Sequence, residues 1–379
     1  MDAMTDKKLS PPIWVATPAD LQSLAKDLAS QPRFAVDTES NSLYAYQEQV
    51  CLIQFSTPEK DYLLDPLALT DLNLLAPLFA DPNIEKVFHA AEYDLICLKR
   101  DFGFTFENLF DTMVAARILG YEAVGLGKLL SQKFDVQVDK KFQKANWGKR
   151  PLPADMLNYA RFDTHYLLEL SQILQWELKE KERWDLAKED FLLATHVNGH
   201  TSRQQLPIWE RVGGRAKLDP RQATVLNEVC LARETLAAKL NRPVFKIVGN
   251  KALLKLAESQ PHSRRDLEID GFTPRQISRF GKTLLAAVER GRRADLVRRT
   301  PSPRPSDAYI FRFEKLREWR KEKAKKMGVE SDVVLPRFLM EIIAKKNPRD
   351  KEALAAIMAK SPWRLEEYGD EILAKISKL

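Results

Sequence analysis

The sequence predicts an α/β domain followed by two all-helical domains. Short apolar strands alternate with helices over the first part of the chain, whereas strand-like segments nearly vanish after about residue 206. Two blocks of the second half then repeat at a spacing of 87–88 residues, which indicates a duplicated helical domain. We therefore expect domains over residues 1–205, 206–292 and 307–379, with a linker over 293–306.

The α/β domain begins with a predicted helix over residues 17–29, with Thr17 as N-cap and Pro18 at the first helical position. An apolar strand opens at Arg33. Residues 49–57 and 61–66 predict two more strands, and their short connection favours antiparallel pairing. The other expected elements are a helix around 71–80, a strand over 84–90, helices over 91–102 and 107–119, and a long helix from about 154 to 180.

Two pairs of matching blocks define the helical domains. Phe280-Gly281 before KTLLAAV parallels Tyr368-Gly369 before DEILAKI, and KIVGNKALLKLA parallels VVLPRFLMEIIA. The segment RRTPSPRPS lies between the two domains and has the Pro, Ser and Arg content typical of a linker.

The composition is that of a soluble globular protein, with 379 residues, 44% hydrophobic and 30% charged. No apolar run approaches the roughly 20 residues that cross a bilayer, and the N-terminus lacks the apolar centre of a signal peptide, so we expect a cytoplasmic protein. The three cysteines are far apart, which argues against both a disulfide framework and a zinc site.

Charge is unevenly distributed along the chain. The net charge is +7, but residues 1–100 carry −7 and the remainder carries +14. An acidic first part and a basic remainder indicate a cation-binding site beside a surface for a polyanion. Uneven surface charge without a function is the alternative.

Carboxylates stand at three informative places in the first domain. Asp37 and Glu39 point to the same side of a strand, where two like charges raise each other's cost of ionising. Asp94 follows a strand near the start of a helix, and Tyr159 and Asp163 share one helix face. Each has an ordinary alternative: a solvated strand end, a first-turn helix acid and a surface pair.

Taken in this order, the motifs D-x-E, a middle Asp and Y-x-x-x-D resemble the tyrosine-type DEDD 3′→5′ exonucleases of the ribonuclease D family. The segments NLFDTMVAARIL, KKFQKANWGKRPL and YARFDTHYLLEL strengthen the resemblance. The duplicated helical domain resembles the helicase-and-ribonuclease-D C-terminal (HRDC) domain. Two departures stand out: Asn146 replaces the usual Asp before Trp147, and Leu231 in the first helical domain replaces the Trp that the second keeps at Trp319.

The resemblance implies a ribonuclease H-like fold for the first domain and hydrolysis that releases 5′-mononucleotides. It implies that Asp37, Glu39, Asp94 and Asp163 hold two divalent metal ions, Mg²⁺ or Mn²⁺, for which anionic oxygens are suitable ligands. Tyr159 is implied to be the fifth catalytic residue. It is a neutral phenol at pH 7, so it is expected to hold the attacking water rather than act as a base.

Basic residues supply the expected contacts to nucleic acid. A cluster precedes the helix that bears Tyr159, with aromatic rings interleaved, and the helix over 312–326 holds eight Lys or Arg against three Glu. A solvated helix face is the alternative for that helix. The residues predicted to bind nucleic acid are Lys140, Lys141, Lys144, Trp147, Lys149, Arg150 and Arg320.

We therefore expect a monomeric 3′→5′ exoribonuclease that trims the 3′ ends of structured RNA such as tRNA precursors. Residues 1–205 should suffice for the chemistry, and the helical domains should add affinity for structured RNA. A DNA-directed proofreading or repair exonuclease of the same superfamily is the first alternative, because the acids do not distinguish the sugars. An inactive nucleic-acid-binding scaffold is the second.

Overall fold

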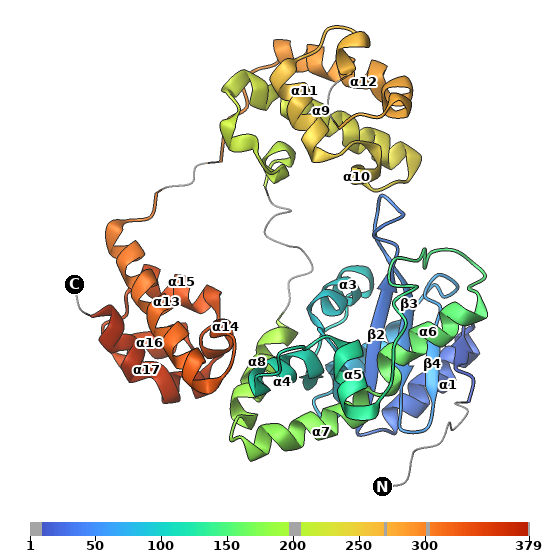
Figure 1. The fold of residues 1–379 in the computed structure, drawn as a ribbon. Helices are drawn as coiled ribbons and strands as arrows, with labels where there is room; N and C mark the ends of the chain where they lie inside the picture. Colours follow the sequence, from blue (N-terminus) through green and yellow to red (C-terminus); the bar gives the residue numbers. More distant parts are fainter. Residues whose placement is uncertain (1–9, 197–205, 269–270, 301–303, 378–379) are drawn as a thin grey trace. The chain divides into compact units, whose positions relative to one another are not determined.

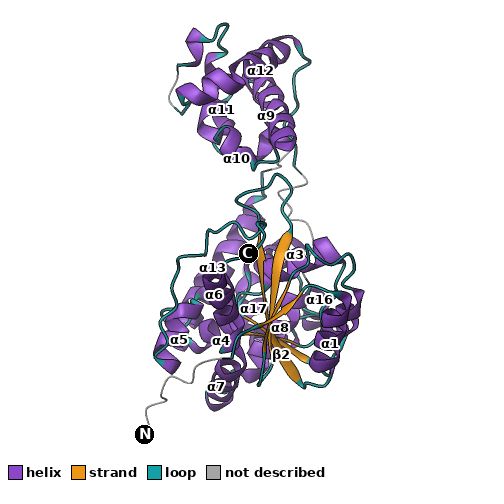
Figure 2. Cartoon of the chain, turned by 90° about the vertical axis from the view of Figure 1, so that its right-hand side faces the viewer, coloured by secondary structure: helices purple, strands orange, loops and turns teal. Residues whose placement is uncertain are grey.

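A six-stranded mixed sheet organises the first domain, in the order β1-β4-β3-β2-β5-β6. Strands β3 and β4 pair antiparallel, as their short connection predicts, whereas β1 with β4, β2 with β5 and β5 with β6 pair parallel. Figure 2 shows the strands twisting through this domain with helices on both sides. The strands are β1 (Ile13–Val15), β2 (Arg33–Ser40), β3 (Val50–Ser56), β4 (Asp61–Leu64), β5 (Glu85–Phe88) and β6 (Leu109–Asp111).

The computed structural model describes residues 10–196, 206–268, 271–300 and 304–377 and confirms an α/β domain followed by two helical domains (Figure 1). Contacts divide the chain into two compact units. The first unit comprises the described residues of 1–39, 50–199 and 304–379, and the second those of 40–49 and 200–303. The predicted boundary at residue 205 and residues 301–303 of the predicted linker lie outside the described residues.

The predicted helices of the first domain form with two differences, and the helices Leu126–Phe134 and Trp184–Thr195 are additional ones that the sequence does not predict. Residues 107–119 do not form one helix, because strand β6 precedes α4 and the Asp111 side chain caps that helix. The long helix expected over 154–180 is divided at Tyr166 into α6 and α7. The helices are α1 (Pro18–Ala29), α2 (Ala76–Ala80), α3 (Glu92–Phe102), α4 (Thr112–Leu119), α5 (Leu126–Phe134), α6 (Ala154–His165), α7 (Leu167–Glu180) and α8 (Trp184–Thr195).

Helix α1 begins as its sequence predicts. The Thr17 hydroxyl accepts a hydrogen bond from the Asp20 amide at 3.2 Å, and the Asp20 carboxylate accepts one from the Thr17 amide at 3.1 Å. This reciprocal capping box satisfies two amides that the helix leaves without an internal partner.

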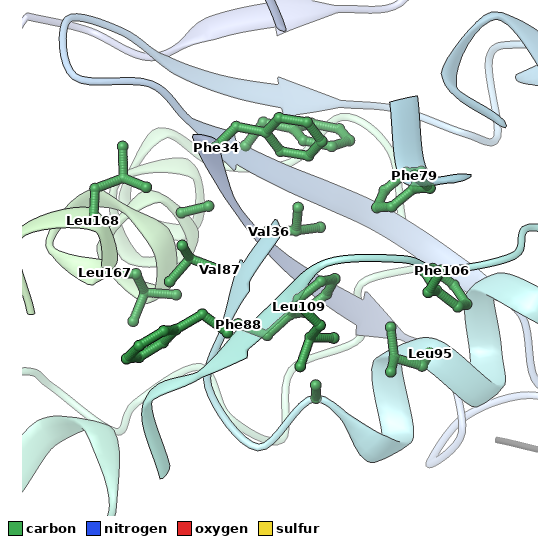
Figure 3. Packing of buried hydrophobic residues seen from close by; sticks show 14 of the residues in the cluster. Phe34, Val36, Phe79, Val87, Phe88, Leu95, Phe106, Leu109, Leu167 and Leu168 are labelled. Atoms are coloured by element: carbon green, nitrogen blue, oxygen red, sulfur yellow. The ribbon is translucent and has the colours of Figure 1, made fainter. Parts of the chain in front are cut away.

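Two apolar clusters hold the sheet and its helices together. In the larger cluster, Phe34 and Val36 of β2 lie near Val87 and Phe88 of β5, with Leu167 of α7 alongside (Figure 3). A smaller cluster lies between β3, β4 and α6 and contains Leu52, Leu63, Trp147, Met156 and Ala160. The second cluster fixes α6 against the sheet, and α6 carries two of the predicted catalytic residues.

Each helical module has a core of its own. The first module is built around the long helices α9 and α12, and the second around α13 and α17. The first module contains α9 (Pro220–Leu240), α10 (Val244–Ile247), α11 (Asn250–Ser259) and α12 (Pro274–Arg293). The second contains α13 (Asp307–Met327), α14 (Ser331–Val334), α15 (Arg337–Lys346), α16 (Lys351–Ile357) and α17 (Pro362–Ile376). Within the described part of the chain, no helix combines the length and apolar character needed to cross a membrane.

The second helical module is part of the same compact unit as the α/β domain. The Arg364 guanidinium of α17 is fully buried and contacts the carboxylates of Glu189 and Asp190 on α8, the latter at 2.8 Å. The same guanidinium donates hydrogen bonds to the carbonyls of Val333 and Val334 at 2.8 and 3.1 Å. A buried charge that is this fully paired fixes the geometry of the contact.

A second contact joins the end of α4 to the second module through close backbone packing. Gly120, which ends α4, lies so close to Gly328 that an added Cβ would stand 2.3 Å from the Gly328 carbonyl oxygen. Beside it, Arg117 pairs with Asp332 at 2.6 Å, and Arg183 donates to the Met327 carbonyl at 2.6 Å. The positive φ of 83° at Gly120 also favours glycine there.

We predict that Arg364→Met lowers the free energy of unfolding by about 3–5 kcal/mol, because it leaves two neighbouring carboxylates without their buried cation. The midpoint of urea-induced unfolding measures the change. Arg337→Met is the matched control, since Arg337 belongs to an exposed pair with Glu341 on one helix, and its midpoint should stay close to that of the wild type. Equal midpoints for the two variants would show that the buried cluster does not hold the unit together.

Candidate active site

Strand β2 places the first two carboxylates at the end of its buried run. Phe34, Ala35 and Val36 are fully buried, whereas Asp37 and Glu39 are partly exposed. The apolar run anchors the strand in the core, and the alternation of a strand sends both acids to one side. The strand therefore delivers two carboxylates to a position that solvent still reaches.

Helix α3 supplies Asp94 in its first turn. The Asp94 side chain is 6% exposed, and its Oδ1 accepts a short hydrogen bond from the hydroxyl of Thr38 on β2. Thr38 stands between Asp37 and Glu39 in the sequence, so the same strand carries two of the acids and orients a third. The sequence pattern did not identify Thr38, because a hydroxyl between two acids has no distinctive spacing.

Helix α6 carries Tyr159 and Asp163 and is held in place by polar groups on β3 and β4. The Ser56 hydroxyl bonds to Asp61 at 2.7 Å and to the Thr164 hydroxyl at 2.8 Å. His165 Nδ1 lies 2.9 Å from Asp61 Oδ2, and Arg161 Nε lies 3.7 Å from the same oxygen. These groups anchor the helix by side chains other than the two that the sequence predicts to be catalytic.

The electrostatics show that the four carboxylates are gathered in one site. Burial raises the pKa of Asp37 well above its ordinary value, and the charges of Asp94, Asp163 and Glu39 raise it further. Burial also raises the pKa of Glu39 to about 9, with Asp163 and Asp94 acting in the same direction. The pKa values of Asp94 and Asp163 rise to about 7, again chiefly by burial.

Tyr159 belongs to the same site. Burial raises the pKa of its phenol above the ordinary range, and the charges of Asp163, Glu39 and Asp37 add to the effect. The phenol is therefore neutral at neutral pH and can donate a hydrogen bond. The structure thus brings together all five residues that the sequence singles out: Asp37, Glu39, Asp94, Tyr159 and Asp163.

These acids fit a pair of divalent cations by their chemistry. Burial and mutual repulsion of carboxylates dominate their pKa shifts, and among the described residues no Lys or Arg appears as a main cause. Anionic oxygens that lack a cationic partner are the ligands that Mg²⁺ and Mn²⁺ prefer. Over the described ranges, no three His, Cys, Asp or Glu side chains converge closely enough to form a metal centre as they stand.

The structure differs from the prediction at Trp147. Its ring is 1% exposed and packs in the cluster between α6 and the sheet, so it offers no face on which a base could stack. The Trp147 and Phe142 rings instead flank Tyr159, with ring centroids 6.2 and 5.7 Å from that of Tyr159. The aromatic residues of this segment therefore pack around Tyr159 from within the fold.

Two of the arginines predicted to bind nucleic acid also have partners within the protein. Arg150 forms two 2.6 Å hydrogen bonds with the Asp65 carboxylate and donates to the carbonyls of Trp147 and Cys51. Arg320 is partly buried and donates to the Leu335 carbonyl at 2.8 Å. These bonds assign both guanidinium groups a structural role, which sequence spacing alone could not reveal.

The four lysines of the same segment are exposed and remain predicted contacts to nucleic acid. Lys141 lies 3.4 Å from Asp155, an exposed pair of small energetic weight. Exposed ammonium groups near the site are suited to binding phosphates, because they can pair with the phosphate charge without breaking buried polar contacts. The four are Lys140, Lys141, Lys144 and Lys149.

Comparison with known proteins matches this site to a family. Residues 12–179 match the family described as 3′-5′ exonuclease, and residues 222–288 and 312–376 each match the HRDC domain. Ribonuclease D of Pseudomonas paraeruginosa is 27% identical over 366 residues, which cover 95% of this chain and 96% of that protein.

Two eukaryotic proteins are also similar. Protein RRP6-like 3 of Arabidopsis thaliana is 43% identical over 279 residues, covering 67% of this chain, although the chain spans only 31% of that longer relative. The crystal structure of the catalytic core of RRP6 from Trypanosoma brucei is 30% identical with a TM-score of 0.63, covering 74% of this chain and 79% of the other.

The raised pKa values predict an unusual pH dependence of stability in the metal-free protein. The folded acids keep their protons up to about pH 7 or pH 9, whereas the unfolded acids lose them near pH 4. The folded state binds more protons in this window, so the free energy of unfolding should fall as pH rises through it. A divalent cation binds the ionised acids, and its stabilising effect should be larger at about pH 8 than at about pH 6.

Thermal unfolding with Mg²⁺ or with EDTA at both pH values measures this effect. Saturation to about 100 times the Kd should add about 2.7 kcal/mol. Asp37→Asn should abolish most of the Mg²⁺-dependent rise in Tm, whereas Asp185→Asn, which removes an exposed acid of α8, should leave it intact. If Mg²⁺ leaves the Tm of the wild type unchanged at both pH values, the metal assignment is contradicted.

Proposed function

Since the chain belongs to the family of 3′-5′ exonucleases with HRDC domains, we propose that it is a metal-dependent 3′→5′ exoribonuclease of the ribonuclease D type. It removes nucleotides one at a time from the 3′ end of RNA and releases them as 5′-mononucleotides. Ribonuclease D and the RRP6 proteins are the relatives that support RNA as the substrate.

One observation carries the proposal: four carboxylates and a neutral phenol share a single partly exposed site in which, among the residues that the structure describes, the acids have no dominant cationic side-chain partner. Holding these charges together destabilises the metal-free fold, because each acid raises the cost of ionising its neighbours. A cation-dependent reaction explains why the site is built in this way. A simple binding surface for RNA would instead present positive charge.

Each side chain has a defined part in the proposed reaction. Asp37, Glu39, Asp94 and Asp163 hold two divalent cations, which when bound supply an activated water and neutralise charge on the phosphoryl group and the leaving 3′-oxygen. Tyr159 donates its phenol hydrogen bond to the attacking water and keeps it in line with the scissile P–O bond. Because Tyr159 remains neutral, it orients the water and does not remove its proton.

The exposed lysines next to α6 position the substrate. Lys140, Lys141, Lys144 and Lys149 lie in the segment that leads into the helix bearing Tyr159 and Asp163. Ammonium groups there meet backbone phosphates without reading the sequence of the RNA. The enzyme should therefore accept many 3′ ends, and we propose that structured RNAs such as tRNA precursors are its natural substrates. We further propose that the enzyme acts in the cytoplasm as a monomer and uses Mg²⁺ or Mn²⁺ as its metal.

Matched RNA and DNA oligonucleotides of the same sequence test the substrate. Faster release of ribonucleotides in Mg²⁺ supports the proposal, and faster release of deoxyribonucleotides would favour the proofreading or repair exonuclease. If neither oligonucleotide releases nucleotides in the presence of metal, the alternative of an inactive nucleic-acid-binding scaffold is favoured.

Asp37→Asn and Asp163→Asn should each lower kcat by more than about 100-fold at saturating Mg²⁺, since loss of even an indirect partner of a metal ligand costs about 10–100-fold. Each change removes a charge while nearly preserving size. Release of labelled 5′-mononucleotides measures the rate, and Asp185→Asn controls for loss of one acidic charge in the same domain. A variant that keeps more than a few per cent of the wild-type rate would remove its residue from the catalytic set.

Tyr159→Phe should lower kcat by about 100-fold with little change in KM, because it removes only the hydroxyl that holds the water. Tyr166→Phe is the matched control. Tyr166 lies just beyond α6 and stacks on Phe162 with ring centroids 6.2 Å apart, so the loss of its hydroxyl should leave kcat unchanged. If both variants behave like the wild type, Tyr159 serves packing alone.

A further inference from the structure

A single buried carboxylate, Asp111, connects the starts of two helices. Its Oδ1 accepts hydrogen bonds from the amides of Met113 and Val114 at 2.8 and 3.1 Å, which caps α4. The same oxygen accepts one from Ala90 at 3.0 Å, and Oδ2 accepts one from Ala91 at 2.8 Å. Asp111 is 2% exposed, so four amide donors replace water around it.

Helix α3 depends on Asp111 because it has no cap of its own. Its N-cap residue, Ala91, has no side-chain acceptor, and four amides at a helix start need partners. The preceding residue, Ala90, has φ 61°, an unfavourable conformation for a residue with a Cβ. Such a turn persists only where the surroundings hold it, and here the Asp111 carboxylate holds the amides of both residues.

Asp94 follows three residues after Ala91, in the first turn of α3. Its side chain is fixed at the far end by the Thr38 hydroxyl, and its backbone is fixed by the turn that Asp111 holds. Burial raises the pKa of Asp94, and the charge of Asp111 raises it further, whereas the hydrogen bond from Thr38 lowers it. The effect of Asp111 indicates that the two carboxylates lie near each other. A shift of the α3 start would carry Asp94 away from Asp37 and Asp163.

We propose that Asp111 is a positioning residue for the exonuclease reaction: it holds the Ala90–Ala91 turn so that Asp94 meets the other three acids. The proposal rests on the proposed function in one respect, namely the role of Asp94 as a metal ligand. The competing explanation is that Asp111 only caps α4 and contributes to stability like any other helix cap.

Two substitutions separate the explanations. In Asp111→Asn, the side-chain oxygen can keep the three hydrogen bonds from Ala90, Met113 and Val114. The new NH₂ group then faces the Ala91 N–H, and because both groups are donors, the bond from Ala91 is lost. In Asp111→Ser, the hydroxyl is a good cap for α4 but is too short to reach across to α3. Both variants therefore release the start of α3 while keeping a cap on α4.

Hydrogen exchange of the metal-free full chain is the first readout. The Ala91 amide should exchange at least about 10-fold faster in both variants, because it loses its buried acceptor in each. The amides from Glu92 to Asp94 should also exchange faster, because the turn that precedes them is no longer held. The amides of Met113 and Val114 should change little. Thr17→Ala, which removes the cap of α1 in the same domain, controls for a general loss of stability and should not affect either group.

Mg²⁺ dependence of nucleotide release is the second readout. Both Asp111 variants should need about 10–100-fold more Mg²⁺ for half-maximal rate, and higher Mg²⁺ should recover part of kcat, since a displaced ligand weakens binding of the cation. Thr17→Ala should keep the wild-type Mg²⁺ midpoint. An unchanged midpoint in both Asp111 variants, or faster exchange confined to α4, would overturn the positioning role.

The two readouts also keep this proposal distinct from the proposed function. A wild-type chain that releases no nucleotide in Mg²⁺ refutes the exonuclease assignment, whatever the Asp111 variants do. An active wild type whose Asp111 variants match Thr17→Ala in both exchange and Mg²⁺ midpoint refutes the positioning role alone.

Discussion

The repulsion among four partly buried carboxylates is the constraint on which the rest of the first domain depends. Asp94 and Asp163 raise the pKa values of Asp37 and Glu39 on top of the effect of burial, and Asp94 also raises the pKa of Asp163. Ionising these acids therefore destabilises the metal-free fold. A site of this kind survives only if each acid is fixed by groups outside it. Its free energy is recovered when a cation binds, which ties stability to the same ions as the proposed catalysis.

The fold meets this constraint by anchoring each acid from a separate element. A run of apolar residues buried in the core holds β2, so Asp37 and Glu39 cannot move apart without moving the sheet. Thr38 and Asp111 fix the two ends of the Asp94 segment. Asp61, which contacts His165, and the ring of Trp147, which packs near Tyr159, hold α6 in place. Removal of any one anchor would let repulsion displace its acid first.

The sequence points to acids that the structure brings together, but it does not reveal the groups that support them, for a physical reason. Asp37 and Asp163 each have an ordinary explanation when taken alone, and only the order of the motifs along the chain, which resembles a known family, singles them out. Supports such as Thr38 act through contacts between residues distant in sequence, and their spacing is unremarkable. The same limit affected Trp147 and Arg150. Aromatic and basic residues near a site predict nucleic-acid contact, but here burial and the Asp65 carboxylate engage them within the protein.

The contact of the second helical module changes how the division of labour between the domains should be understood. The sequence places every catalytic candidate before residue 164, which favours a first domain that works alone. The structure gives that domain a surface with Glu189 and Asp190 whose cation, Arg364, belongs to α17. Removing the second module would uncover two unpaired carboxylates and apolar residues that pack with Val333. The module is therefore part of the body that holds the site, and any contribution it makes to RNA binding comes in addition to that structural role.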